Sequence, residues 1–76
     1  MVELVKYIAK ALVDNPGEVK VNQREEEDAY VIELTVAPDD MGKVIGKQGR
    51  IAKAIRTVVK AASVKSEKKY IVDIID

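Results

Sequence analysis

The spacing of hydrophobic residues changes several times along the chain, and each change predicts a new element. Over residues 2–14, apolar side chains recur every three or four positions, with Glu3, Lys6 and Lys10 between them. This period is typical of an amphipathic helix. The Asn-Pro-Gly sequence at residues 15–17 then predicts that the helix stops and the chain turns.

Two segments that alternate apolar and polar residues follow this turn. Val19 and Val21 alternate with polar residues over 18–24 and predict a short strand. Residues 29–37 alternate more strongly and predict a second strand. The Glu-Glu-Glu-Asp sequence at 25–28 is a charged turn between them. We therefore expect an antiparallel hairpin.

The second half of the chain returns to a helical period. Pro38 ends the second strand, and Asp39 or Asp40 can cap a short helix that we expect to end before Gly46. A longer helix is predicted from about Arg50 to residue 62 or 63. The β-branched residues of 69–76 predict a closing strand.

The resulting order is helix, strand, strand, helix, glycine loop, helix, strand. Three short strands with three helices on one face form an α+β two-layer sandwich. A chain of 76 residues has room for one hydrophobic core, so we expect a single domain over residues 1–76.

Composition excludes several kinds of chemistry. The chain has no Cys and no His, which removes thiol or imidazole catalysis, disulfides and the usual zinc sites. The charged residues of the N-terminal segment argue against a signal peptide or a membrane span. We expect a cytoplasmic protein that needs no cofactor and no metal.

The formal net charge is zero, but the charges are segregated. Between Gly42 and Ser66 there is no acidic residue and there are seven basic ones: Lys43, Lys47, Arg50, Lys53, Arg56, Lys60 and Lys65. On the long helix, four of them fall within an arc of about 120° and form a basic stripe: Arg50, Lys53, Arg56 and Lys60. We expect the opposite face, with Ile51, Ile55, Val58 and Ala62, to pack on the sheet.

The sequence Val-Ile-Gly-Lys-Gln-Gly-Arg at 44–50 joins the two helices. One glycine can simply end a helix, which accounts for Gly46 but not for Gly49. Two glycines beside a helix N-terminus give a phosphate backbone close access to bare amides, and Lys47 and Arg50 add positive charge. A Walker loop does not fit, because Gln48 stands where Ser or Thr would hold magnesium.

This Gly-x-x-Gly loop between two helices, with Val44-Ile45 before it and Ala52 and Ile55 after it, resembles that of the K homology (KH) domain. The element order is similar to the type II, prokaryotic arrangement and covers essentially the whole chain. The resemblance implies that Gly46, Lys47, Gln48 and Gly49 clamp the backbone of about four single-stranded nucleotides. It also implies that Lys43, Arg50 and Lys53 flank the phosphates, and that Ile45, Ala52 and the edge of the second strand supply an apolar groove for bases.

The chain is similar to the small bacterial proteins that consist of one KH domain. That likeness implies an RNA-binding, RNA-chaperone or post-transcriptional regulatory role. It also implies a homodimer, or a heterodimer with a larger KH-containing protein of the Jag type.

Two other hypotheses stay open. The first is a protein-interaction module in which the basic stripe is only solvated. The second is catalysis by the acidic turn at 25–28, which we do not favour because consecutive carboxylates in a turn diverge into solvent.

Overall fold

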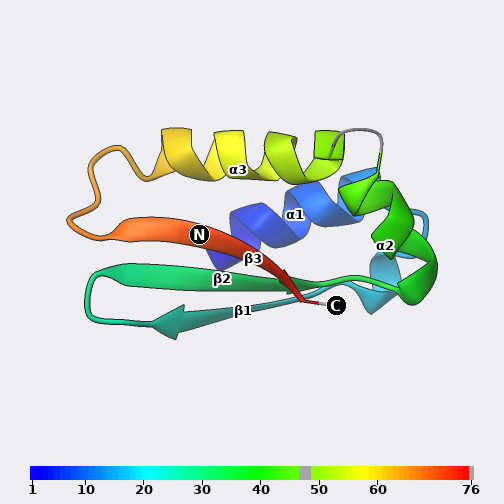
Figure 1. Ribbon diagram of the computed structural model, residues 1–76, viewed down its shortest axis with the longest axis horizontal. Helices are drawn as coiled ribbons and strands as arrows, with labels where there is room; N and C mark the ends of the chain where they lie inside the picture. Colours follow the sequence, from blue (N-terminus) through cyan, green and yellow to red (C-terminus); the bar gives the residue numbers. More distant parts are fainter. Residues whose placement is uncertain (47–48, 76) are drawn as a thin grey trace.

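The computed structural model describes residues 1–46 and 49–75. The elements follow the predicted order (Figure 1): helix α1 Val2–Leu12, a short 3-10 helix η1 Pro16–Glu18, strands β1 Lys20–Glu25 and β2 Ala29–Thr35, helices α2 Pro38–Ile45 and α3 Arg50–Ala62, and strand β3 Lys69–Ile75. In the part of the chain that is described, no helix is both long and apolar enough to cross a membrane.

The three strands form one mixed sheet in the order β1-β2-β3. β1 and β2 pair antiparallel, with Glu25 opposite Tyr30, which confirms the predicted hairpin. β3 returns parallel to β2, with Ala29 opposite Lys69. Because β2 is paired on both sides, it has no free edge for a groove, and the prediction that its edge contributes one is wrong. The free edge next to α3 belongs to β3.

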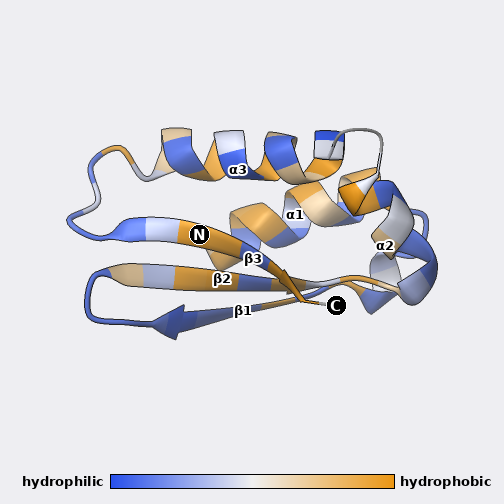
Figure 2. Cartoon of the chain, viewed as in Figure 1, coloured by the Kyte–Doolittle hydropathy of each residue, from blue (hydrophilic) through white to orange (hydrophobic). Residues whose placement is uncertain are grey.

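Helices α1 and α3 lie along one face of the sheet, and α2 packs against α3 at one end of this layer (Figure 1). The space between the layers is filled by fully buried aliphatic side chains, among them Ile32 and Leu34 of β2 and Ile55 of α3. β1 is largely hydrophilic (Figure 2), and only Val21 on it is half-buried. This is the α+β arrangement that the residue pattern predicted, and its element order is the type II KH-like order that the family resemblance implies.

Helix α3 faces the core with a different side from the one predicted. Its buried residues are Ala52, Ile55 and Val59, whereas Val58 is 36% exposed and Ala62 is also exposed. At 3.6 residues per turn, the buried face is rotated by roughly 60° from the predicted one. Val58 and Val59 have the same chemistry, so the residue pattern could not choose between them. The rotation leaves the basic stripe beside the sheet edge instead of directly opposite the core.

The start of α2 also differs from the prediction. The N-cap is Ala37, Pro38 occupies the first turn, and no side chain among residues 1–46 and 49–75 caps this end. Proline suits this position because the amide it lacks would have no partner inside the helix. Asp40 is therefore not a cap, and its carboxylate binds elsewhere.

Candidate nucleic-acid interface

Gly46 ends helix α2 and lies in close contact with it. Its N–H donates to the carbonyl of Gly42 at 2.7 Å, and its backbone is extended, with φ −79°. A Cβ at this position would collide with the Gly42 carbonyl oxygen. Glycine is therefore required here for close packing of the chain on its own helix, as the C-cap interpretation predicted.

Gly49 is required for a different reason. It is the N-cap of α3 and has φ 68°, in the left-handed region, where side chains other than glycine are strained. Its N–H donates to the Gly46 carbonyl at 2.8 Å, which closes the turn between the helices. Apart from its chain neighbours, no atom of the described residues lies within 4 Å of a Cβ placed at Gly49.

The two glycines bring the N-terminus of α3 to the surface. No side-chain hydrogen bond caps this end within the described residues. The first amides of a helix and its dipole favour an anion at such an end. Arg50 and Lys53 are exposed beside it. The predicted loop residues Lys47 and Gln48 lie outside the described residues.

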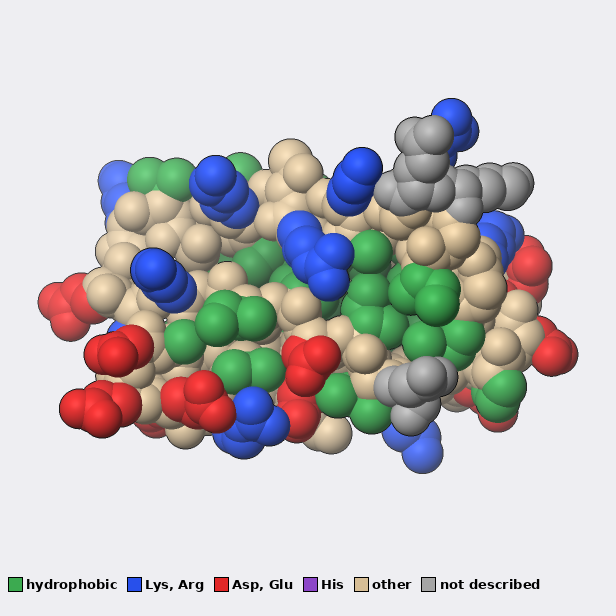
Figure 3. Space-filling view, viewed as in Figure 1, with side chains coloured by type: hydrophobic (Ala, Val, Ile, Leu, Met, Phe, Trp, Pro, Cys, Tyr) green, Lys and Arg blue, Asp and Glu red, His purple; other side chains and the backbone are tan. Residues whose placement is uncertain are grey.

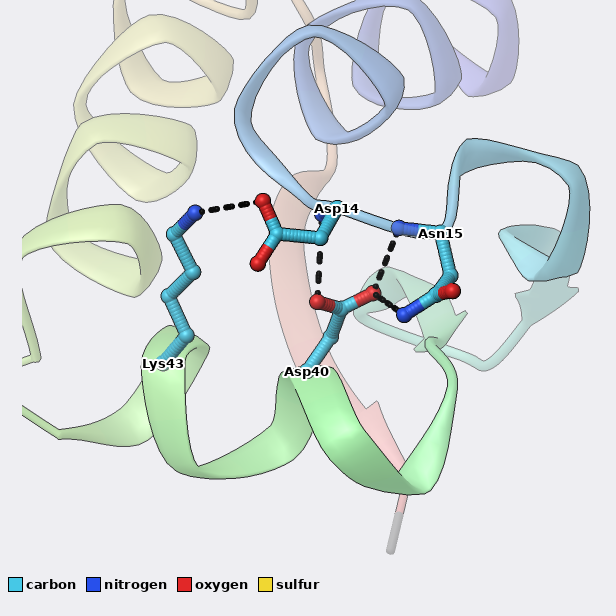
Figure 4. Close-up of polar contacts among 4 residues, drawn as sticks. All are labelled: Asp14, Asn15, Asp40 and Lys43. Carbon is cyan, nitrogen blue, oxygen red and sulfur yellow. Dashed lines mark hydrogen bonds and ion pairs between the residues drawn. The ribbon is translucent and has the colours of Figure 1, made fainter.

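Asp40 fixes helix α2 to the end of α1 (Figure 4). Its carboxylate is 1% exposed and accepts hydrogen bonds from the backbone N–H of Asp14 at 3.1 Å and of Asn15 at 3.0 Å. The Asn15 side-chain amide donates a third at 3.2 Å. Burial alone raises the pKa of Asp40, but these hydrogen bonds and the charge of Lys43 together lower it below its ordinary value. The helix that leads into the glycine loop is thus held by a buried, ionised side chain.

Lys43, one turn before Gly46, is not free of partners. Its Nζ lies 3.1 Å from Oδ1 of Asp14, and both side chains are solvent-accessible (Figure 4). An exposed pair of this kind is worth about 0–1 kcal/mol. A phosphate near Lys43 therefore competes with Asp14 for the lysine ammonium. Breaking the Lys43–Asp14 pair costs little free energy.

A groove of about 640 Å³ runs between α3 and β3 on the side of the free sheet edge. Arg56, Val59 and Lys60 line it from the helix, and Tyr70 and Ile71 line it from the strand. Its far end is closed by the loop over 63–68 that joins the two elements. No residue pattern indicated this groove, because its walls come together only when β3 pairs with β2.

The two predicted apolar contact residues differ in accessibility. Ile45, at the end of α2, is 58% exposed and is available to a ligand beside the loop. Ala52 is only 4% exposed and belongs to the core. Its side chain packs in the core under α3, so the prediction that it contacts a base is not retained.

Charge is distributed unevenly over this face (Figure 3). Lys and Arg side chains lie along α3, acidic side chains gather at the end that carries the β1–β2 turn, and hydrophobic side chains lie between them. The acids of the turn are all exposed, and two of them form ion pairs with different partners: Glu25 pairs with Lys68, and Glu26 pairs with Arg24. The basic stripe, the apolar groove and the glycine junction therefore lie on the same face of the molecule.

The glycine junction between two helices, with cations beside it, is what the KH resemblance implies, although the groove is walled by β3 and not by the edge of β2. Comparison with known families agrees with this resemblance. The family model described as "KhpA/KhpB, KH domain" matches residues 2–74. The chain belongs to this KH-domain family.

Curated relatives in this family match over their full lengths. A protein of Caldanaerobacter subterraneus subsp. tengcongensis named RNA-binding protein KhpA is 67% identical over 75 residues, covering 99% of this chain and 100% of the relative. Proteins of the same name from Clostridium perfringens and Listeria monocytogenes are 64% and 49% identical, covering 99% and 100% of this chain and all of each relative. No solved structure matches the chain significantly.

Proposed function

We propose that this KH-family chain binds single-stranded RNA across the face built from the α2–α3 junction, the basic stripe and the groove. The observation that carries the proposal is that one helix, α3, joins the glycine junction at its N-terminus to the groove along its C-terminal half, with exposed cations along its length. In this arrangement, the RNA backbone crosses the loop at residues 46–49. Its phosphates lie near Lys43, Arg50 and Lys53.

The chemistry of the face suits a flexible single strand. Single-stranded bases are unstacked and can turn toward apolar surface while the backbone stays near positive charge. Here Ile45 and the groove supply apolar surface on one side of the path, and the basic stripe supplies charge on the other. The names of the relatives, which say that they bind RNA, support the same ligand.

The proposal is tested by the salt dependence of RNA binding. A labelled single-stranded RNA is titrated at salt concentrations between about 50 and 300 mM with wild type and with the variant Arg50→Gln, Lys53→Gln. Each lost phosphate contact reduces the slope of log K against log salt by about 0.7 for a single strand. We expect the double variant to bind more weakly, with a slope reduced by about 1.4.

The matched control removes two positive charges elsewhere. Lys10→Gln with Lys20→Gln changes exposed side chains on α1 and β1 and makes the same change in net charge. We expect this control to keep nearly the wild-type slope. Equal losses in the two variants would mean that RNA responds only to net charge, and the assigned face would be wrong.

We also propose that this chain associates with a second KH-domain chain, either a copy of itself or a larger partner, in addition to binding RNA. The side chain of Tyr7 on α1 is 76% exposed, and we assign it to the surface of this contact. Two linked sites on one RNA would raise the apparent affinity through effective concentration. Sedimentation with and without RNA tests it, and a monomer in both states would contradict it. A role as an RNA chaperone stays a prediction.

A further inference from the structure

We propose that Lys68 is a positioning residue of the RNA-binding groove: it fixes the α3–β3 loop to the β1–β2 turn and does not contact phosphate. This inference rests on the proposed function, because it assigns a role within the same groove. It separates Lys68 from the other cations that line the groove, which composition alone would group with it.

Lys68 itself lines the groove, but the partners of its side chain are not among the lining residues. Its Nζ donates to Oε2 of Glu25 at 2.7 Å and to the backbone carbonyl of Glu26 at 3.0 Å. The same Nζ lies 5.0 Å from the centre of the Tyr30 ring, within the range of a cation–π contact. We call this set of residues, Lys68 with Glu25, Glu26 and Tyr30, the Lys68 brace. An ammonium has three N–H donors, and the brace uses two of them as well as the charge.

The Lys68 brace joins segments that are far apart in the sequence. Lys68 and Glu25 are separated by 43 positions. The neighbouring Lys69 N–H donates to the carbonyl of Asp28 at 3.4 Å, which ties β3 to the same turn. The side chain of Lys68 is only 28% exposed, well below the exposure of a freely solvated lysine. The loop that closes the groove is thus attached at its end to the hairpin.

The brace also supports a wall of the groove. The ring of Tyr30, beside Nζ, packs on the ring of Tyr70, with their centres 5.0 Å apart. Tyr70 lines the groove next to Ile71. Movement of Lys68 would therefore be transmitted through the two rings to the surface on which a base would lie.

The charge around Lys68 argues against a phosphate contact. The hydrogen bond to Glu25 raises the pKa of Lys68, which stays protonated with its charge offset by that carboxylate. Glu26, Glu27 and Asp28 follow directly in the turn and repel phosphate. By contrast, Arg56 and Lys60 on the helical wall are exposed, and the ion pairs of the described residues do not include them. The RNA backbone is expected to follow α3 and to stay clear of the turn.

The test compares Lys68→Met with Lys60→Met, which removes one cation from the opposite wall. RNA affinity is measured at several salt concentrations. For Lys60→Met we expect the magnitude of the slope of log K against log salt to decrease by about 0.7, which is the signature of a lost phosphate contact. For Lys68→Met we expect affinity to fall by about threefold to tenfold while the slope stays at the wild-type value. Lys68→Arg should restore most of the affinity, because a guanidinium still pairs with Glu25.

Amide hydrogen exchange provides a readout that needs no RNA. Exchange at Lys69 should accelerate in Lys68→Met and in Glu25→Gln, since both break the brace, but not in Lys60→Met. The Glu25→Gln variant keeps the test open if Lys68→Met does not fold.

Two results would overturn the inference. A drop in slope for Lys68→Met equal to that for Lys60→Met would make Lys68 a phosphate ligand. Unchanged exchange at Lys69 in the variants that break the brace would show that it does not hold the loop. Absence of RNA binding by the wild type would instead refute the proposed function, and the exchange experiment would still decide whether the brace exists.

Discussion

The basic side chains near the two ends of helix α3 have opposite roles. At its N-terminus, Arg50 and Lys53 are exposed beside a glycine junction, and Lys43 has one weak, accessible partner in Asp14. Beyond its C-terminus, in the loop that leads to β3, Lys68 is engaged by a carboxylate, a carbonyl and an aromatic ring. A lysine is available to a ligand only where the fold does not already use it. The first end is suited to binding, and the second holds the groove in shape.

This comparison requires that the buried face of α3 hold both ends on the sheet. Ile55→Ala removes a fully buried side chain from the middle of that face. We expect the free energy of unfolding to fall by about 2–5 kcal/mol, measured by urea denaturation. Arg56→Ala, at the next position but exposed, should change it by less than about 0.5 kcal/mol. Similar losses in the two variants would mean that the division of the helix into a core face and a binding face is wrong.

The two glycines of the junction should differ in their tolerance of a side chain. In Gly46→Ala the new Cβ meets the Gly42 carbonyl oxygen, and we expect a loss of about 1–3 kcal/mol in unfolding free energy. In Gly49→Ala the space is open and only the left-handed backbone is strained, for about 1 kcal/mol. Gly49→Asn should recover part of this loss, because asparagine tolerates that conformation. A larger loss at position 49 than at position 46 would contradict the geometry of the junction.

Acid and alkali should weaken opposite ends of the molecule. The pKa of Asp40 is lowered in the folded chain, so its contribution to stability is present above the unfolded-state pKa, about 3.9, and is lost as pH falls through the folded-state pKa. The pKa of Lys68 is raised, so its contribution is present below about pH 10.4 and is lost as pH rises through the folded-state pKa.

Thermal unfolding midpoints measured across pH test this difference. Asp40→Asn should flatten the acid-side loss and leave the alkaline side unchanged, and Lys68→Met should do the reverse. Asp39→Asn, in an exposed position beside Asp40, is the control and should keep the wild-type profile. If Asp40→Asn lost stability in acid as the wild type does, the ionised Asp40 carboxylate would not be what stabilises α2.

The smallest expected effect concerns the partner of Lys43. Asp14→Asn keeps the hydrogen bond from the backbone N–H of residue 14 to Asp40, but it releases the Lys43 ammonium. RNA affinity should rise modestly, by up to about fivefold, which corresponds to the usual range for an exposed ion pair. The control Glu18→Gln also removes one exposed acid, and Glu18 pairs with no lysine in the described part of the chain. An equal rise in the control would show only an effect of net charge.

The residue pattern was informative where structure depends on neighbours in the sequence. The hairpin followed from the alternation on both sides of residues 25–28, and α3 followed from its helical period. The pattern failed where distant segments meet. Asp40 is a residue type that often caps helices, but the backbone groups it binds lie 25 and 26 positions away in the sequence.

The candidate site divides in the same way. The glycine junction and the basic stripe are local features and were found from the sequence. The groove depends on the parallel return of β3 beside β2, and the choice of Val59 over Val58 depends on the packing of α3. Lys68 has no distinguishing sequence context, and only its contact with Glu25 separates it from the cations around it.

The central claim is that RNA is bound at the loop between Gly46 and Gly49. The most direct test is a fluorescence-anisotropy titration of a labelled single-stranded RNA with wild type and with Lys47→Asp, Gln48→Asp, each checked for folding by circular dichroism. The matched control, Lys20→Asp with Gln23→Asp, makes the same substitutions at exposed positions of β1. We predict saturable, salt-sensitive binding by the wild type and the control, and its loss in a folded loop variant. Undiminished binding by the folded loop variant would contradict the claim.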